Sequence, residues 1–358
     1  MKEFRVIVVI PSYEPPLSFI TYVQDLVKRK LEVIVINDGS SEKYDSVYNQ
    51  IKDINGVTLL SYNDNRGKGY ALKFAFNYIC ENYLDNYAVV TADCDGQHAV
   101  NDVLALSQTA KTYKNSLVLG VRDFSSEKVP RRSRFGNVST RRLFSLLYGL
   151  KLKDTQTGLR AFTSELIGDM LTINGNRFEY EMNALIVLHK KNISFIEVPI
   201  ETIYEEKPKE VEKRSHFKTF SDSLKVWSVL LKNVNTYLIA VIISLIVEIC
   251  LFSVSEYLIF KNLSPYLKTL YSSVIARVIS SIVNYHLNYK FVFNGKGKST
   301  VVRYYALWVG LLTSSYLLTN LFGNVLGLPI VLFKLIVDGV LAIISYRIQT
   351  IWVFPHKK

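Results

Sequence analysis

The sequence predicts an α/β protein, a mostly parallel sheet covered by helices, followed by a helical membrane domain. In the first part of the chain, short apolar runs rich in β-branched residues alternate with segments of helical spacing, the pattern of βαβ units. From Tyr237 onward, long apolar runs with few charges dominate instead. The overall hydrophobic content of 49% therefore averages over two different environments.

Five runs have the length and composition of buried strands, and two segments between them have helical spacing. Because βαβ crossovers build parallel sheets with helices on both faces, we expect ligands to bind outside the carboxyl ends of these strands. The run that begins at Phe4 is too short for a signal peptide and leads into Pro11. The predicted strands are 4–10, 31–36, 57–62, 87–92 and 116–121, and the predicted helices are 17–30 and 69–83.

Composition narrows the class of partner and the redox environment. The formal charge of +12 could suit nucleic acid, but the basic residues gather near the domain junction and at the ends of the apolar runs. We therefore expect a lipid bilayer and no nucleic acid as partner. The spacing of Cys80, Cys94 and Cys250 is typical neither of zinc ligands nor of a disulfide framework. We therefore expect the catalytic part of the chain to be cytoplasmic, with its cysteines reduced.

Polar side chains follow four of the predicted strands. The clusters are Pro11-Ser12-Tyr13, Asn37-Asp38-Gly39-Ser40, Asp93-Cys94-Asp95 and Arg122-Asp123, and parallel pairing brings them to one crevice. A dinucleotide-binding Rossmann domain would carry a glycine-rich turn after its first strand, but the sequence there is "PSYEPP". The later "NRGKGYAL" lacks the third glycine of that motif.

Two of these motifs have a chemical interpretation and a simpler alternative. Gly67 and Gly69 could let a ligand approach the backbone at the start of a helix, whose N-terminal N–H groups favour an anion or the edge of a base. Alternatively, the two glycines could simply form a turn. Asp93 and Asp95 could share Mg²⁺ or Mn²⁺ with a nucleotide diphosphate, or could end a strand simply because aspartate suits turns.

Five motifs in order resemble the family 2 glycosyltransferases of GT-A fold: "VIPSYEPP", "VINDGSS", "NRGKGYALKFAF", "ADCDGQH" and "DTQTGLRAF". Three more, "VPRRSRFGN", "RFEYEMNAL" and "SHFKTFSDSLKVW", make the chain similar to polyprenyl-phosphate glycosyltransferases of the dolichol-phosphate mannose synthase type. The resemblance spans residues 4–232. It implies that Asp38 contacts the nucleoside, Asp93 the ribose or base, and Asp95 the metal, with Gln97 beside it.

The same resemblance implies a wider set of substrate-binding residues at these motifs. A basic residue is expected shortly before Ser215, and both Lys213 and Arg214 fit, so the residue that reaches the diphosphate stays open. Further expected metal ligands beside Asp95 are Asp93 and Gln97. The remaining substrate-binding residues are Pro11, Tyr13, Glu14, Gly67, Lys68, Arg132, Ser215 and His216.

The expected chemistry is transfer of one sugar to a lipid phosphate. A phosphate monoester has a second pKa of about 6, so it is a dianionic nucleophile without a general base, and one displacement inverts the anomeric carbon. We find no Gln-x-x-Arg-Trp segment of the kind that holds a growing polymer.

Basic and acidic side chains of the later motifs complete the expected catalytic site. One loop is rich in arginine, and the planar guanidinium group of arginine suits the binding of phosphate. Alternatively, this loop could be a solvated basic surface or could contact lipid head groups. Asp154 and Arg160 are expected to shape the sugar pocket, while Glu179 and Glu181 bind sugar hydroxyls or brace the arginines. The arginines of the loop are Arg122, Arg131, Arg132 and Arg134.

The expected domains are a cytoplasmic catalytic domain at 1–212, an interfacial amphipathic helix at 213–235 and a membrane domain at 236–358. Basic residues at the ends of the even spans orient the catalytic domain and the C-terminus toward the cytoplasm. A buried helix of the catalytic domain is the alternative for the amphipathic segment. The four expected spans are 237–255, 270–290, 304–322 and 329–350.

An internal repeat links the spans into two hairpins, since "NYHLNYKFVF" at 284 matches "SYRIQTIWVF" at 345. This half resembles GtrA-like membrane domains, which implies a part in translocating lipid-linked sugars, or an anchor or oligomerisation role. Four charged residues lie within the spans and are expected to pair or to line a path: Glu248, Arg277, Lys334 and Asp338.

The function expected from the sequence is therefore inverting transfer of a single hexose or N-acetylhexosamine, from a nucleotide-diphosphate sugar, to a polyprenyl phosphate. A plasma-membrane homo-oligomer serving cell-envelope glycosylation is the expected context. The alternative is a non-enzymatic nucleotide-binding membrane scaffold or a translocation component.

Overall fold

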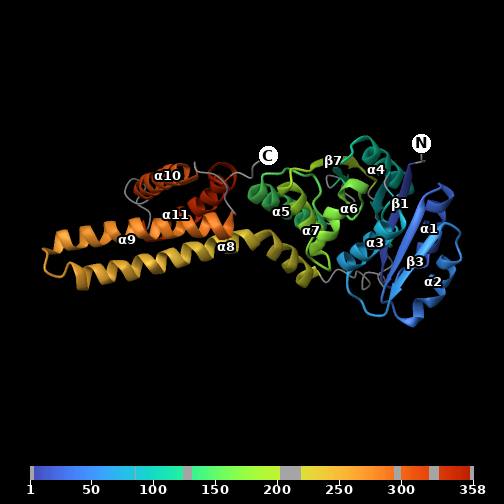
Figure 1. Ribbon diagram of the computed structural model, residues 1–358, viewed down its shortest axis with the longest axis horizontal. Helices are drawn as coiled ribbons and strands as arrows, with labels where there is room; N and C mark the ends of the chain where they lie inside the picture. The colour runs from blue at the N-terminus through green and yellow to red at the C-terminus, as the bar shows by residue number, and fades with distance from the viewer. Residues whose placement is uncertain are drawn as a thin grey trace. The chain divides into compact units, whose positions relative to one another are not determined.

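The computed structural model describes residues 4–84, 86–123, 131–201, 219–293, 300–321 and 330–354. The chain divides into two compact units, Met1–Val229 and Leu230–Lys358, and each is described by itself. The first is an α/β unit and the second is helical (Figure 1).

A seven-stranded sheet forms the centre of the first unit, in the order β3-β2-β1-β4-β6-β5-β7. Strand β6 pairs antiparallel with β4 and β5, while the other pairs are parallel. The strands are β1 (Arg5–Ser12), β2 (Glu32–Asp38), β3 (Val57–Tyr62), β4 (Tyr87–Thr91), β5 (Ser116–Val121), β6 (Arg160–Thr163) and β7 (Ser194–Pro199).

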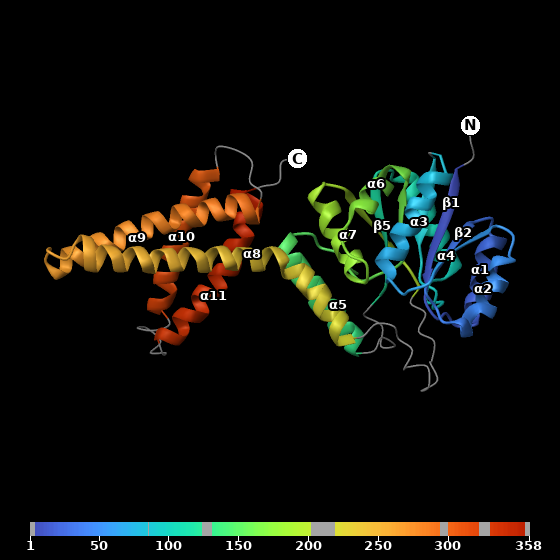
Figure 2. The same ribbon diagram turned by 60° about the horizontal axis from the view of Figure 1, so that its bottom comes forward.

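Helices cover both faces of this sheet (Figure 2). One face packs on α1, α2 and α4, and the other contacts α3 and α6. The elements are α1 (Ser18–Lys28), the 3₁₀ turn η1 (Glu42–Tyr44), α2 (Asp45–Lys52), α3 (Lys68–Asn82), α4 (Val100–Thr112), α5 (Arg131–Tyr148), α6 (Ser164–Thr172) and α7 (Glu179–Lys190).

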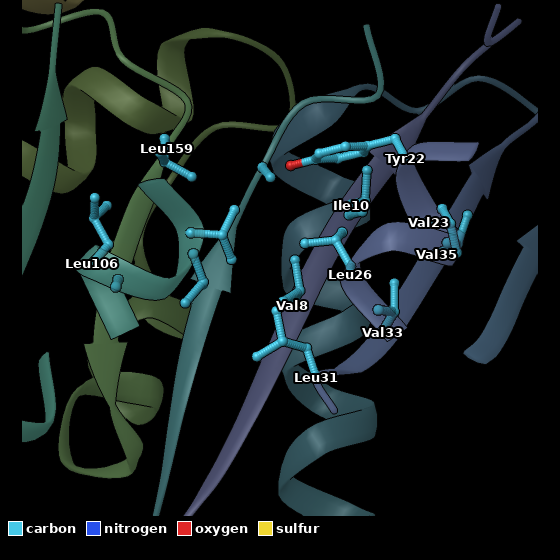
Figure 3. Packing of buried hydrophobic residues seen from close by; sticks show 14 of the residues in the cluster. Val8, Ile10, Tyr22, Val23, Leu26, Leu31, Val33, Val35, Leu106 and Leu159 are labelled. Atoms are coloured by element: carbon cyan, nitrogen blue, oxygen red, sulfur yellow. The ribbon is translucent and has the colours of Figure 1, made fainter. Parts of the chain in front are cut away.

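Burial on both faces explains the unbroken apolar runs of the sequence. In β1, Val8 and Ile10 belong to the cluster formed with α1, while Ile7 and Val9 are equally buried on the opposite side. Figure 3 shows Val8 and Ile10 against Tyr22 and Leu26. A strand covered on both sides has no polar face, so its sequence does not alternate.

All five predicted strands are present, and β3 and β5 have the predicted limits. The sequence analysis did not predict β6 or β7, nor that one strand is antiparallel. Strand β6 has only four residues, "RAFT", which is too short to show a periodicity.

The second unit is built from the part of α8 (Thr219–Val254) that begins at Leu230, together with α9 (Pro265–Leu287), α10 (Thr300–Asn320) and α11 (Ile330–Ile348). Three π-helical turns, η3 (Ser255–Ile259), η4 (Asn288–Val292) and η6 (Gln349–Val353), extend α8, α9 and α11. Helix α8 is continuous across the boundary expected at residues 235 and 236. Among the described residues, the stretches long and apolar enough to cross a membrane are Val234–Ile259 and Ile336–Val353.

The internal repeat has the same local structure in both copies. Each copy ends in a π-helical turn closed by a phenylalanine, whose N–H donates to Asn288 O or to Gln349 O. The rings of Phe293 and Phe354 stack with centroids 5.0 Å apart. The buried Asn288 amide donates to Gln349 Oε1 at 3.2 Å, so the two repeats meet at equivalent side chains.

Helices α3 and α7 of the first unit pack unusually closely at Gly69. A Cβ atom at this position would lie 2.5 Å from Tyr180 Cβ. Tyr180 is almost fully buried, and its hydroxyl donates to Met170 O, so its side chain is held in place. The glycine is therefore needed for the close approach of the two helices.

We expect Gly69→Ala to lower the free energy of unfolding by about 1–3 kcal/mol, because overpacking outweighs the better helix propensity of alanine. The matched control is Gly168→Ala in α6, where a Cβ meets nothing within 4 Å and alanine should stabilise by about 0.5–1 kcal/mol. Thermal unfolding in detergent micelles measures both. Equal effects of the two substitutions would contradict the packing role of Gly69.

Candidate active site

The carboxyl ends of adjacent strands bring the polar motifs together. Ser12 at the end of β1 lies beside Asn37 in β2, and β4 follows β1 in the sheet. Because β6 is antiparallel, it begins at this same edge, where Arg160 pairs with Thr91. The reversed strand thus places the segment before Arg160 next to the aspartates that follow β4.

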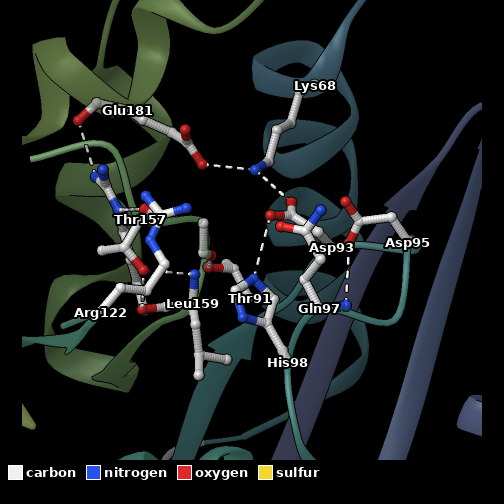
Figure 4. Close-up of polar contacts among 12 residues, drawn as sticks. Lys68, Thr91, Asp93, Asp95, Gln97, His98, Arg122, Thr157, Leu159 and Glu181 are labelled. Atoms are coloured by element: carbon white, nitrogen blue, oxygen red, sulfur yellow. Dashed lines mark hydrogen bonds and ion pairs between the residues drawn. The ribbon is translucent and has the colours of Figure 1, made fainter. Parts of the chain in front are cut away.

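A lysine between two carboxylates lies at the centre of this edge (Figure 4). Lys68 Nζ is 2.5 Å from Asp93 Oδ1 and 2.7 Å from Glu181 Oε1. His98 Nε2 lies 3.2 Å from the second carboxylate oxygen of Asp93. The first residue of α3, the end of β4 and the first turn of α7 are therefore joined by one ionic cluster.

The cluster fixes the charge state of its members. Burial alone would raise the pKa of Asp93, but the charge of Lys68 and the hydrogen bond from His98 outweigh it and hold the pKa well below its usual range. Burial lowers the pKa of Lys68, while Asp93 and Glu181 more than reverse this and raise it. Lys68 and Asp93 are therefore both charged across the physiological pH range.

Gly158 makes room for this cluster. A Cβ at this position would be 2.4 Å from Asp93 Oδ2 and 2.7 Å from Lys68 Nζ. Gly158 lies between Asp154 and Arg160, the two residues that were expected to shape the sugar pocket. Only a glycine leaves space for the ion pair beside it.

Asp95 differs from Asp93 in its surroundings. Its side chain is exposed, and Oδ1 accepts the backbone N–H of Gln97 at 3.2 Å. Both carboxylate oxygens of Asp93, in contrast, contact Lys68 and His98. No group of three or more acidic, histidine or cysteine side chains able to hold a metal occurs among the described residues.

One exposed carboxylate still fits a divalent cation that is bound together with a phosphate ligand. Mg²⁺ commonly uses one or two carboxylates, the phosphates of its substrate and water. Asp95 is the more exposed of the two carboxylates, whereas both oxygens of Asp93 are engaged by the side chains of Lys68 and His98. Metal ligation by Asp95, Asp93 and Gln97 stays a prediction.

Asp38 braces the loop that leads into α3. Its carboxylate accepts the hydroxyl of Tyr62 at 2.8 Å and the N–H groups of Arg66 and Gly67 at 2.8 and 2.9 Å. Burial raises the pKa of Asp38, and these hydrogen bonds lower it in part. The helix terminus that was expected to attract an anionic ligand thus binds a carboxylate of the protein itself.

The glycines of "RGKG" serve packing within the protein. A Cβ at Gly67, which has a positive φ of 97°, would lie 2.6 Å from Asn176 O. Tyr70 N donates to that same carbonyl at 2.9 Å. The structure therefore accounts for these glycines through the segment at 174–180, while contact with a ligand stays a prediction.

Arg122 is paired with Asp154. Its Nε and Nη2 donate to the two oxygens of Asp154 at 2.7 and 3.3 Å. The buried Asp154 also accepts Asn137 Nδ2 and the N–H of Gln156. Part of the Arg122 guanidinium is thus engaged by a carboxylate, which limits how it can meet a phosphate.

Arg160 and Glu179 hold backbone segments. The buried guanidinium of Arg160 donates to Thr157 O at 3.0 Å and to Glu181 O at 2.8 Å. Glu179 Oε1 accepts the N–H groups of Asn176 and Arg177. These contacts position the start of α7, and contact of either residue with a sugar stays a prediction.

The first strand end has its own hydrogen bonds. Ser12 Oγ donates to Ile36 O at 2.9 Å, and Glu14, in a left-handed conformation with φ 47°, donates its N–H to Ser40 Oγ. Pro11 is buried in β1, and burial with the adjacent Glu14 raises the pKa of Tyr13. Arg132 and Arg134 lie in α5, but their side chains fall outside the described part of the structure, as do Ser215 and His216 entirely.

The sequence analysis missed three side chains at this edge. His98 contacts Asp93, Tyr62 contacts Asp38, and Asn137 contacts Asp154. His98 was visible in "ADCDGQH", directly after the acidic pair. Asn137 was visible as the last residue of "VPRRSRFGN". Tyr62 had no comparable signal, because it lies far along the chain from Asp38.

Each of the two units matches the model of a known family. Residues 7–169 match the model of glycosyl transferase family 2, and residues 236–354 match the GtrA/DPMS transmembrane domain. The first unit is a glycosyltransferase of GT-A fold. The chain therefore carries a family 2 glycosyltransferase domain in its first unit and, in its second unit, a GtrA/DPMS transmembrane domain that makes it a membrane protein.

Individual relatives match the first part of the chain. A UDP-N-acetylglucosamine–dolichyl-phosphate N-acetylglucosaminyltransferase of Methanococcus voltae is 27% identical over 58% of this chain and 88% of its own length. A dolichyl-phosphate beta-glucosyltransferase of Saccharomyces cerevisiae is 25% identical over 56% of this chain and 67% of its own. Glucosyl-3-phosphoglycerate synthase from Mycobacterium tuberculosis, solved with Mn²⁺ and UDP, aligns with 64% of this chain and 79% of its own, with a TM-score of 0.47 and 16% identity.

We expect Lys68→Met to destabilise the first unit by about 3 kcal/mol, because it leaves two carboxylates close together without their cation. The double variant Lys68→Met with Glu181→Gln should recover part of this loss. Thermal unfolding measures both, and Lys28→Met is the control because its ion pair with Asp25 is exposed and worth about 1 kcal/mol or less. If Lys68→Met is no worse than Lys28→Met, the cluster does not stabilise the fold.

Proposed function

We propose that the chain transfers one hexose or N-acetylhexosamine from a nucleotide-diphosphate sugar to a polyprenyl phosphate, and that this sugar is UDP-linked, as the name of the Methanococcus voltae relative indicates for that protein. The product is a polyprenyl-monophosphate sugar that serves as donor in cell-envelope glycosylation. The observation that carries the proposal is the exposed Asp95 at the end of β4, in a glycosyltransferase joined to a membrane domain.

The donor is proposed to bind at the carboxyl ends of β1, β2 and β4. Its diphosphate needs cations, yet Lys68 and Arg160 already bind carboxylate or carbonyl oxygens, and Arg122 is bonded to Asp154. Asp95 and Gln97 would hold Mg²⁺ or Mn²⁺, which when bound stabilises the departing nucleoside diphosphate. The nucleoside would lie near Asp38 and Asp93.

The acceptor needs little activation. With a second pKa of about 6, its phosphate is mostly dianionic at neutral pH and attacks the anomeric carbon without a general base. The protein's part is to align the phosphate oxygen with the sugar and to offset repulsion between two sets of phosphates. A single displacement of this kind inverts the anomeric centre.

The positions of the basic residues in the sequence support one orientation of the chain in the membrane. We propose that four spans cross the bilayer, with the catalytic unit and the C-terminus on the cytoplasmic side. The first part of α8 would lie in the membrane interface and bring the site to the lipid phosphate. Association into homo-oligomers stays a prediction without further support.

We expect Asp95→Asn to lower turnover about a hundredfold or more, because an amide is a weaker ligand for a hard cation, while the thermal midpoint stays unchanged. Added Mn²⁺ should restore part of the activity. The assay incubates membranes with radiolabelled nucleotide sugars and extracts the lipid product. Asp53→Asn, the same change at another exposed aspartate, is the control. Full turnover of Asp95→Asn in the presence of chelator would remove the metal from the proposal.

We expect Arg134→Ala to raise the KM for polyprenyl phosphate about ten- to a hundredfold, while nucleotide-sugar binding measured without lipid stays normal. Arg142→Ala removes an exposed arginine of the same helix and should have no such effect. Lysine at position 134 should restore binding only in part. Loss of donor binding with an unchanged acceptor KM would assign Arg134 to the diphosphate instead.

Arg122 requires a different design, because Arg122→Ala alone would leave the buried Asp154 without its cation. The double variant Arg122→Ala with Asp154→Asn avoids that charge. If Arg122 also contacts the acceptor phosphate, the double variant should fold and still show a raised acceptor KM. A normal KM would restrict Arg122 to bracing Asp154.

A further inference from the structure

A buried tyrosine lies beneath the loops that follow β1 and β2. Tyr48 belongs to α2, which packs beside α1 on one face of the sheet (Figures 1 and 2). Its ring belongs to the apolar cluster on that face, and the residue is 4% exposed. Its hydroxyl, in contrast, contacts polar groups at the end of β1 and in the loop after β2.

Five short distances connect this hydroxyl to both loops. Tyr48 Oη lies 2.8 Å from Ser40 Oγ, 3.1 Å from Ser12 Oγ and 3.3 Å from Ser12 O. Ser12 Oγ donates to Ile36 O at 2.9 Å. The N–H of Glu14 donates to Ser40 Oγ, also at 2.9 Å. One hydroxyl of α2 therefore joins the loop after β1 to the loop after β2.

The donors along this chain of hydrogen bonds follow from the number of protons available. Each hydroxyl carries one proton and accepts up to two hydrogen bonds. Burial raises the pKa of Tyr48 to about 12, so its hydroxyl keeps its proton at neutral pH. Ser12 uses its own proton on Ile36 O, so Tyr48 donates to Ser12. Ser40 then donates to Tyr48, and the chain runs in one direction from the N–H of Glu14 to Ile36 O.

The residue at the start of this chain has an unfavourable backbone conformation. Glu14 has a φ of 47°, in the left-handed region that residues other than glycine rarely adopt. Such a conformation persists only where surrounding contacts hold it. Ser40, which accepts the N–H of Glu14, is itself held by Tyr48 and by Asn37 Oδ1, to which the N–H of Ser40 donates at 2.9 Å. The conformation of Glu14 therefore depends, through Ser40, on the hydroxyl of Tyr48.

We propose that Tyr48 is a positioning residue for the nucleotide part of the donor. It acts through Ser12 and Ser40, and fixes the segments 12–14 and 37–40 against each other at the strand ends where the donor is proposed to bind. The identity of the ligand rests on the proposed function, whereas the effect on Glu14 rests on the hydrogen bonds alone. Because these segments contact the nucleotide alike before and during transfer, loss of the hydroxyl weakens donor binding and leaves the chemical step unchanged.

The first test is binding of UDP and of GDP, each with Mg²⁺, to the full chain in detergent micelles, measured by isothermal titration calorimetry. Tyr48→Phe removes the hydroxyl and keeps the ring in its cluster. For the nucleotide that the unaltered chain binds, we expect this variant to raise the Kd about three- to tenfold, the scale of one hydrogen bond. The KM for the nucleotide sugar should rise by a similar factor, with kcat unchanged.

The matched control is Tyr22→Phe. Tyr22 packs in the same cluster, and its buried hydroxyl has no hydrogen-bond partner within the described part of the structure. This variant loses the same atom at a place that does not hold the loops. It should bind the nucleotide as the unaltered chain does.

Further variants test whether Tyr48 acts through Ser40 and Glu14. Ser40→Ala should weaken nucleotide binding about as much as Tyr48→Phe, and the double variant should be little worse than either alone. Glycine adopts the left-handed region without penalty, so Tyr48→Phe should weaken binding less in a Glu14→Gly background than in the unaltered chain. A Tyr48→Phe variant that merely lowered stability would weaken binding equally in both backgrounds.

Hydrogen exchange followed by mass spectrometry provides a readout that needs no ligand. The peptide that contains Glu14 should exchange about three- to tenfold faster in Tyr48→Phe than in the unaltered chain, because the acceptor of its N–H is no longer held. Tyr22→Phe should leave this exchange unchanged.

Equal nucleotide binding by Tyr48→Phe and the unaltered chain would overturn the proposal, and so would unchanged exchange of the Glu14 peptide. Binding of neither nucleotide by the unaltered chain would count against the proposed function instead. In that case the exchange result alone decides whether Tyr48 holds the loop.

Discussion

The ionic contact of Lys68 with Asp93 and Glu181 holds together parts of the catalytic unit that are distant in sequence. The cluster is possible only because the backbone leaves room for it. Gly69 allows α7 to approach α3, and Gly158 allows the segment before β6 to approach Asp93. The ion pairs and the close backbone packing therefore depend on each other. A side chain added at either glycine would separate the charged residues.

Much of the fold could be predicted because burial leaves a direct trace in the sequence. Strands β1, β2 and β4 are covered on both faces and appear as unbroken apolar runs. Strand β6 could not be recognised, because four residues show no period and because its direction depends on neighbours that lie far away in sequence. The reversed strand is nevertheless what brings Arg160 to the site.

The location of the candidate site could be predicted, but the partners of its residues could not. Polar residues after parallel strands must meet at one edge, so Asp38, Asp93 and Asp95 were found together. Which of them face solvent depends on contacts between distant segments, such as Tyr62 with Asp38. The sequence shows that a carboxylate is present, and the tertiary structure decides whether it is already bonded.

This distinction matters for how the protein handles anionic ligands. Among the described residues at the strand ends, Lys68, Arg122 and Arg160 are each bonded to oxygens of the protein. A donor diphosphate that approached them would compete with Asp93 and Asp154, whose carboxylates would then lose their cations, at a cost comparable to the gain. Under the proposed function, a cation held at the exposed Asp95 would supply positive charge for the diphosphate with less disruption than the cations that hold the site together.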